Sequence, residues 1–161
     1  MSTGDEELTG HRLDVSTGGE DEGLTGHILD LAAIWHLLDG KSQYGREILQ
    51  QSVLRNTTLL LPALAAEYLA AMRPEQAEHL LAVPVVTIGA LTEADAVGAG
   101  RVGAQMLANL RRGPSAVDAE LPAVLAGAHA VLLSEARGGW RVITAAPSLY
   151  DGVKVRLEIL P

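Results

Sequence analysis

The 161-residue chain contains no cysteine and no phenylalanine. Without cysteine it can form no disulfide scaffold, no thiolate metal site and no cysteine nucleophile. Aromatic residues make up only 3% of the chain and hydrophobic residues 48%, so the core has to be built mainly from Leu, Val and Ala. No apolar run approaches the ~18 residues of a membrane span, and the first residues are acidic, unlike a signal peptide. We therefore expect a cytoplasmic protein.

The acidity of the chain is concentrated near its start. The net charge is −8, and residues 1–26 hold seven acidic residues against the single base Arg12, a local charge of −6. The remaining residues are almost neutral. The bulk charge therefore gives no indication of a nucleic-acid-binding protein.

The first thirty residues contain a tandem repeat. Residues 2–15 read STGDEELTGHRLDV and residues 16–31 read STGGEDEGLTGHILDL, with Arg12 at the place of Ile28. Only the second copy runs on into apolar residues. We interpret residues 1–26 as a flexible, acidic, Gly-rich leader that is dispensable for folding, and residues 27–161 as one domain. The alternative is that the first copy imitates the strand of the second and competes with it.

Short β-type runs alternate with helical patterns along the rest of the chain. Strands are predicted at residues 27–31, 58–61, 83–88, 141–144 and 153–159. Helices are predicted at residues 32–38, 44–54, 62–72, 74–81, 92–110 and 120–137. Alternating apolar strands and helices are typical of a parallel sheet covered by helices on both faces. The predicted fold is a three-layer α/β/α sandwich around a parallel, roughly five-stranded sheet.

One stretch matches a nucleotide-binding motif in its letters. Gly98, Gly100 and Gly103 fit G-x-G-x-x-G, and Asp118 lies 20 residues beyond Gly98. The motif requires a strand directly before it, so that the pyrophosphate meets a helix N-terminus. Here the preceding residues, from Thr92 on, form a capping box and a first helical turn instead. Two interpretations of the motif remain. One is a binding site for a nucleotide cofactor, and the other is a helix whose glycines allow it to pack closely on the sheet.

Histidines do not point to a metal site. The five histidines form no H-E-x-x-H motif and no ligand pair at i, i+4, so structural or surface roles are expected for them. The chain also lacks a G-x-S-x-G elbow and a P-loop.

The positions of two carboxylates suggest a metal site. Asp30 ends an apolar strand, and Glu67 follows the next strand by about one helical turn, amid alanines. Ligands of parallel sheets bind outside the carboxyl ends of the strands, so both acids could share a Mg²⁺ ion there. The competing interpretations are a helix N-cap for Asp30 and a solvated surface acid for Glu67.

Four blocks carry a resemblance to a known family. They are HILDLAAIWHLLDG, LLLPALAAEYLAAM, VVTIGALTEADAVGAG and AHAVLLSEARGGWRVITAAPSLY. Their order and spacing over residues 27–160 resemble the PIN-domain family in its bacterial toxin-type branch. The resemblance implies a five-stranded parallel sheet between helices, Mg²⁺-dependent ribonuclease activity and neutralisation by a small antitoxin. Of the four acids usual in the family, Asp30 matches the first and Glu67 the second.

The third and fourth acids of the family pattern are missing. The third would fall near Ala123 or Val124, and Asp118 and Glu120, about one turn earlier, could replace it only if the helix began differently. The fourth would follow Thr144, where the chain reads Thr-Ala-Ala. Since nuclease chemistry of this kind needs cation-held water, losing half of the acids should weaken metal binding severely.

Two functions follow from the resemblance. One is a PIN-type ribonuclease with a reduced site and weak or absent activity on RNA, with catalytic residues Asp30, Glu67, Asp118 and Glu120, and Mg²⁺ held weakly, if at all, by Asp30 and Glu67. The other is a non-catalytic PIN-fold module that binds a protein partner or RNA. In either case we expect an antitoxin-like partner and a homodimer.

Overall fold

The centre of the molecule is a sheet of five parallel strands. The computed structural model describes residues 25–112 and 121–161. The strands, in the spatial order β3-β2-β1-β4-β5, are β1 (Gly26–Leu29), β2 (Thr58–Pro62), β3 (Val86–Gly89), β4 (Arg141–Thr144) and β5 (Leu157–Ile159). The predicted parallel five-stranded sheet is therefore confirmed.

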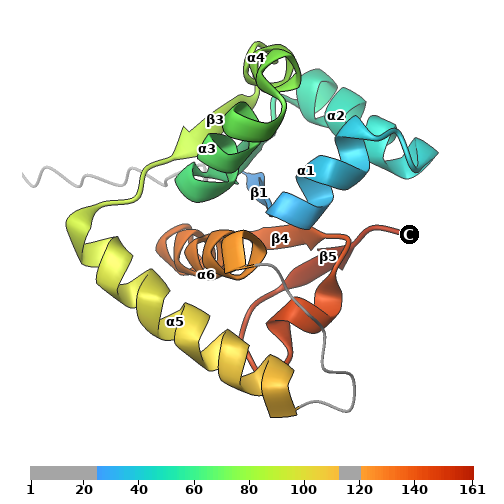
Figure 1. The fold of residues 1–161 in the computed structure, drawn as a ribbon. Helices are drawn as coiled ribbons and strands as arrows, with labels where there is room; N and C mark the ends of the chain where they lie inside the picture. The colour runs from blue at the N-terminus through green and yellow to red at the C-terminus, as the bar shows by residue number, and fades with distance from the viewer. Residues whose placement is uncertain (1–24, 113–120) are drawn as a thin grey trace, which may run out of the picture.

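Helices cover both faces of this sheet (Figure 1). The described helices are α1 (Leu31–Leu38), α2 (Gln43–Arg55), α3 (Ala63–Met72), α4 (Pro74–Leu81), α5 (Glu93–Arg112), α6 (Leu121–Ala136) and the 3₁₀ helix η1 (Pro147–Tyr150). In Figure 1, α1 to α4 lie on one side of the strands and α5 and α6 on the other. The three-layer α/β/α sandwich is thus also confirmed.

The alternation of side chains along the strands explains the two layers of core. In β1, Leu29 packs in the cluster shared with α1, α3 and α4, whereas Ile28 packs in the cluster shared with α5 and α6. Successive side chains of a strand point to opposite faces, so a central strand has to be apolar on both. Ile28 and Leu29 are both 0% exposed, as this position demands.

Three predicted strands are shorter than the sequence indicated. The first ends at Leu29 instead of Leu31, because Asp30 caps α1 and Leu31 begins it. The run from Val83 begins with a turn, in which the Val86 N–H donates to the Val83 carbonyl, and β3 starts only at Val86. Residues 153–156 precede β5, which pairs with β4 only from Leu157. Within the described ranges, no helix combines the length and the apolar character needed to cross a membrane.

Candidate functional site

Asp30 lies where β1 ends and α1 begins. Its backbone is extended, and its Oδ1 accepts a hydrogen bond of 2.7 Å from the Ala33 N–H, which makes it the N-cap of α1. Its Oδ2 accepts a hydrogen bond of 2.9 Å from the hydroxyl of Tyr150, in η1. The residue is only 1% exposed. Both carboxylate oxygens are therefore engaged by the chain itself, at a place that solvent barely reaches.

The electrostatic environment of Asp30 disfavours its charge. Burial raises the pKa of Asp30, and hydrogen bonds from Thr144, Ala33 and Tyr150 offset part of that rise. Burial and the neighbouring Asp30 also hold the pKa of Tyr150 well above its ordinary value, so that its phenol remains a donor. The described cluster of Asp30, Thr144 and Tyr150 thus contains one acid and two neutral hydroxyls.

Sequence reasoning missed Tyr150. The contact with Asp30 joins residues 120 positions apart, and neither is part of a recognisable motif with the other. The only signal is general: a buried tyrosine hydroxyl needs a hydrogen-bond partner. Tyr150 is 3% exposed, and that information comes only with the fold.

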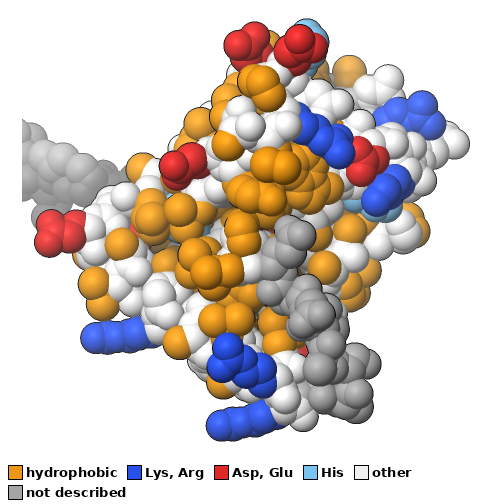
Figure 2. Space-filling model, viewed as in Figure 1, with side chains coloured by type: hydrophobic (Ala, Val, Ile, Leu, Met, Phe, Trp, Pro, Cys, Tyr) orange, Lys and Arg blue, Asp and Glu red, His pale blue; other side chains and the backbone are white. Residues whose placement is uncertain are grey.

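Glu67 lies in a different setting, on the exposed side of α3. It lines a groove of 310 Å³ between α3 and α6, whose other lining residues are Leu64, Tyr68, Ala71, Leu121, Pro122 and Leu125. Hydrophobic side chains dominate the centre of the face drawn in Figure 2, over these helices. Among the described residues that line the groove, Glu67 is the one acid.

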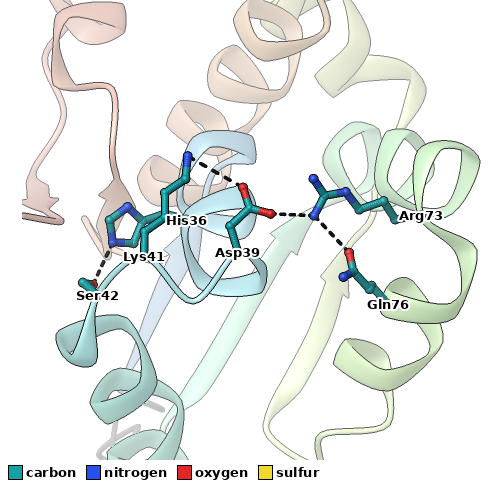
Figure 3. Close-up of polar contacts among 6 residues, drawn as sticks. All are labelled: His36, Asp39, Lys41, Ser42, Arg73 and Gln76. Atoms are coloured by element: carbon teal, nitrogen blue, oxygen red, sulfur yellow. Dashed lines mark hydrogen bonds and ion pairs between the residues drawn. The ribbon is translucent and has the colours of Figure 1, made fainter.

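A polar network fixes the end of α3 next to this groove (Figure 3). Asp39 accepts from Arg73 at 2.7 Å and lies 3.7 Å from Lys41, and Arg73 also donates to Gln76. The Arg73 guanidinium lies 4.6 Å from the ring centre of Trp35. Trp35 in turn meets Tyr68 edge-on at 6.2 Å, so the network supports an aromatic residue of the groove wall.

Comparisons with known proteins show which solved structures share this fold. No protein-family model matches the chain, and no curated protein does either. Solved structures do: VapBC2 from Rickettsia felis, bound to a DNA fragment from its promoter, matches with a TM-score of 0.57 at 11% identity, covering 83% of this chain and 98% of that one. DNA-bound VapBC from Salmonella typhimurium matches with a TM-score of 0.53 at 15% identity, covering 83% and 97%. VapC is a PIN-domain toxin. The chain has a PIN-like fold.

The residues at which the resemblance predicts the third and fourth acids are apolar in this chain. Ala123 and Val124 lie in the first turn of α6, and Val124 is completely buried. At the end of β4, the Ala146 N–H donates to the Thr144 hydroxyl at 3.0 Å, and no carboxylate follows. The proposed substitutes, Asp118 and Glu120, lie outside the described residues.

The described side chains do not fit a Mg²⁺ ion. In residues 25–112 and 121–161, no three histidine, aspartate or glutamate side chains come together as a potential metal site. Mg²⁺ requires near-octahedral oxygen ligands, including one or two carboxylates that it can reach. Asp30 offers a buried carboxyl whose two oxygens already accept hydrogen bonds. The pairing of Asp30 and Glu67 as metal ligands stays a prediction.

The glycine motif is not in the context that a dinucleotide site needs. β3 ends at Gly89, α5 begins at Glu93, and Gly98–Gly103 lies inside that helix. The helix starts with the predicted capping box, in which Thr92 and Asp95 hydrogen-bond each other. A Cβ on Gly98 would lie 3.1 Å from Leu132 of α6, so this glycine permits close helix packing. The structure therefore gives the nucleotide-cofactor alternative no support at this motif.

Two of the histidines have structural roles, as expected. His36 Nε2 is 2.7 Å from the Ser42 hydroxyl, between α1 and α2 (Figure 3). His129 is 0% exposed and its Nε2 lies 3.2 Å from the Ala90 carbonyl oxygen. Burial lowers the pKa of His129, so the ring is held neutral inside the core.

Proposed function

We propose that the chain is a toxin-type PIN-fold protein with weak or no Mg²⁺-dependent ribonuclease activity. The observation that carries this proposal is the state of Asp30. A carboxylate that binds a catalytic cation has to be reachable by it, and this one is 1% exposed with a hydrogen-bond donor of the chain on each oxygen. The apolar residues at the third and fourth acid positions support the same conclusion.

Any residual metal affinity would rest on the remaining acids. Asp30 and Glu67 occupy the first and second positions of the family pattern, and Asp118 or Glu120 would be the only nearby substitutes for the third. A bound Mg²⁺ would supply a polarised water and charge stabilisation at phosphorus.

The first test is a Mg²⁺ titration by calorimetry, together with an RNA-cleavage assay. We expect no saturable Mg²⁺ binding at micromolar to low millimolar concentrations, and cleavage that EDTA does not change. Ala146→Asp should strengthen Mg²⁺ binding, since it places a carboxylate after β4, next to Thr144. Ala145→Asp is the matched control, because it adds the same charge one residue earlier. Robust EDTA-sensitive cleavage that disappears in Asp30→Asn would refute the proposal.

A second function, protein binding, is favoured by the groove between α3 and α6. The described lining residues other than Glu67 are hydrophobic, and they lie on the hydrophobic face of Figure 2. Exposed apolar surface of this kind marks interaction sites. Since the structural neighbours are VapBC complexes, we propose a small antitoxin-like protein as the partner. Its apolar segment would fill the groove, and a basic residue on it would pair with Glu67.

The groove can be tested with two neighbouring alanines of α3. Both are exposed, but only Ala71 lines the groove, so Ala71→Arg should block the partner and Ala70→Arg should not. The measurement is affinity purification from the native host followed by mass spectrometry, with nuclease treatment before elution. A small protein retained by the wild type and Ala70→Arg, and lost in Ala71→Arg, is the expected result. Equal recovery with both variants, or loss upon nuclease treatment, would contradict binding at this groove.

A further inference from the structure

A second cavity lies away from Asp30 and from the groove, between α2 and the sheet. Its volume is 270 Å³. Helix α2 forms one wall with Tyr44, Glu47 and Arg55, and the sheet contributes His27 from β1 and Glu158 from β5. The cavity shares no lining residue with the α3–α6 groove. We refer to it as the α2 cavity.

One hydrogen bond and one close histidine–glutamate contact hold the floor of the α2 cavity. The Tyr44 hydroxyl donates to Glu158 Oε1 at 2.9 Å, and His27 Nε2 lies 3.4 Å from Glu158 Oε2. The neighbouring carboxylate raises the pKa of Tyr44, which keeps the phenol protonated. His27 Nδ1 is buried and has no hydrogen-bond partner among the described residues. Two side chains, from α2 and β1, thus contact one carboxylate of β5.

The mixture of charges selects the kind of ligand. Glu47 and Glu158 are acidic, whereas Arg55 is basic, and Gln51 adds an amide that can donate and accept. A ligand with a charge of either sign at its centre would meet a like charge on one wall. A neutral planar ring with donors and acceptors on its edge would find a partner on both walls.

Size and apolar surface narrow the choice further. Cavities for drug-sized ligands usually measure about 300–1,000 Å³, so the α2 cavity suits a single ring system. Ile48 and Ile143 give it apolar walls, and Tyr44, 41% exposed, offers an aromatic face at the surface. Bases stack on such faces, and carboxylates accept hydrogen bonds from the exocyclic amines of bases.

We propose that the α2 cavity binds the base of a nucleoside monophosphate that carries an exocyclic amine. The base stacks on Tyr44, its amine donates to the carboxylate of Glu47 or Glu158, and the phosphate reaches the exposed guanidinium of Arg55. This site needs no metal ion and does not depend on the proposed function.

Binding is measured on the full chain by calorimetry in buffer that contains EDTA. The probes are adenosine, cytidine, guanosine and uridine monophosphates. We expect at least one of the three amine-bearing nucleotides to bind saturably, with a Kd below about 1 mM. Uridine monophosphate, which lacks the amine, should bind at least about fivefold more weakly. The proposal is overturned if no nucleotide binds saturably, or if uridine monophosphate binds as tightly as the amine-bearing nucleotides.

Two pairs of variants localise the site. Tyr44→Ala should weaken binding roughly five- to hundredfold, the range of stacking on one aromatic side chain, and Tyr44→Phe should retain most of the affinity. Arg55→Ala should weaken the binding of the monophosphate but not the binding of the corresponding nucleoside. Arg46→Ala is its matched control, an exposed arginine of the same helix that does not line the cavity.

The variants also give the outcomes that refute the site. Circular dichroism establishes that each variant is folded. If Tyr44→Ala unfolds, Tyr44→Phe still measures what the Tyr44 hydroxyl contributes to nucleotide binding. If Arg46→Ala weakens binding as much as Arg55→Ala, the attraction is general and the cavity is not the site. If Tyr44→Phe loses as much affinity as Tyr44→Ala, the ring does not stack on the base and the proposed geometry is wrong.

Discussion

Replacing Asp30 with alanine is expected to lower the free energy of unfolding by about 2–3 kcal/mol. Loss of the N-cap contact to Ala33 costs about 1 kcal/mol, and the buried hydroxyl of Tyr150 loses its acceptor, which costs about 1–3 kcal/mol. Relief of the desolvated carboxyl offsets part of this sum. Chemical denaturation monitored by tryptophan fluorescence and circular dichroism measures the effect.

A double-mutant cycle with Tyr150→Phe isolates the contact between the two side chains. Tyr150→Phe removes only the hydroxyl, so the double variant should be less destabilised than the sum of the two single variants, by about 1 kcal/mol. Additive effects would mean that the 2.9 Å hydrogen bond does not stabilise the fold. The melting temperatures should be the same with EDTA and with Mg²⁺. A Mg²⁺-dependent rise seen in the wild type and absent in Asp30→Ala would make Asp30 a metal ligand instead.

The raised pKa of Asp30 predicts how the stability of the protein changes with pH. Because burial raises the pKa of Asp30 above its value in the unfolded chain, the folded state binds the proton more tightly. Asp30→Asn keeps a capping oxygen but cannot titrate. The stability of the wild type relative to Asp30→Asn should therefore rise as the pH falls from above the raised pKa toward the unfolded value of about 3.9, and level off below it. A difference that shrinks on acidification would show that Asp30 is ionised and favourably paired in the fold.

The fold could be predicted from the sequence because its signals are local. Apolar β-type runs of four or five residues, separated by helical patterns, specify buried parallel strands. The capping residues were equally readable: Thr92 and Asp95 form the capping box that their spacing predicted. Strand ends were less predictable, since the start of β3 depends on the turn at Val83 and on its pairing with β2.

The site could be predicted only in part, because its chemistry depends on contacts between distant segments. The end of β1 placed Asp30 at the carboxyl edge of the sheet, and both interpretations, ligand and N-cap, were compatible with the sequence. The structure shows the cap, and the ligand role stays a prediction; the burial of Asp30 and its bond to Tyr150 could not be derived from local pattern. For Glu67, the exposed position agrees with one of the two interpretations, a surface acid, but the apolar groove around it requires α6 to lie beside α3.

The second large effect concerns the one position at which the repeat changes from an apolar to a charged residue. Ile28 is 0% exposed and pairs with Leu60 of β2 and Val142 of β4, so it lies at the centre of the sheet. The first copy of the repeat carries Arg12 at the matching place. Ile28→Arg would bury a guanidinium among apolar side chains, and an uncompensated buried charge costs several kcal/mol.

We expect Ile28→Arg to abolish cooperative unfolding, because this cost approaches the whole stability of about 5–15 kcal/mol typical of a domain. Thermal melts and near-ultraviolet circular dichroism measure it. Ile28→Val should cost only about 0.5–1.5 kcal/mol, which shows that the position tolerates a smaller apolar residue. Leu54→Arg, at a site that is 76% exposed, is the matched control and should change stability by no more than about 0.5 kcal/mol. If Ile28→Arg melts like Leu54→Arg, the centre of the sheet accepts a charge, and the difference between the two copies of the repeat at this position has no consequence for folding.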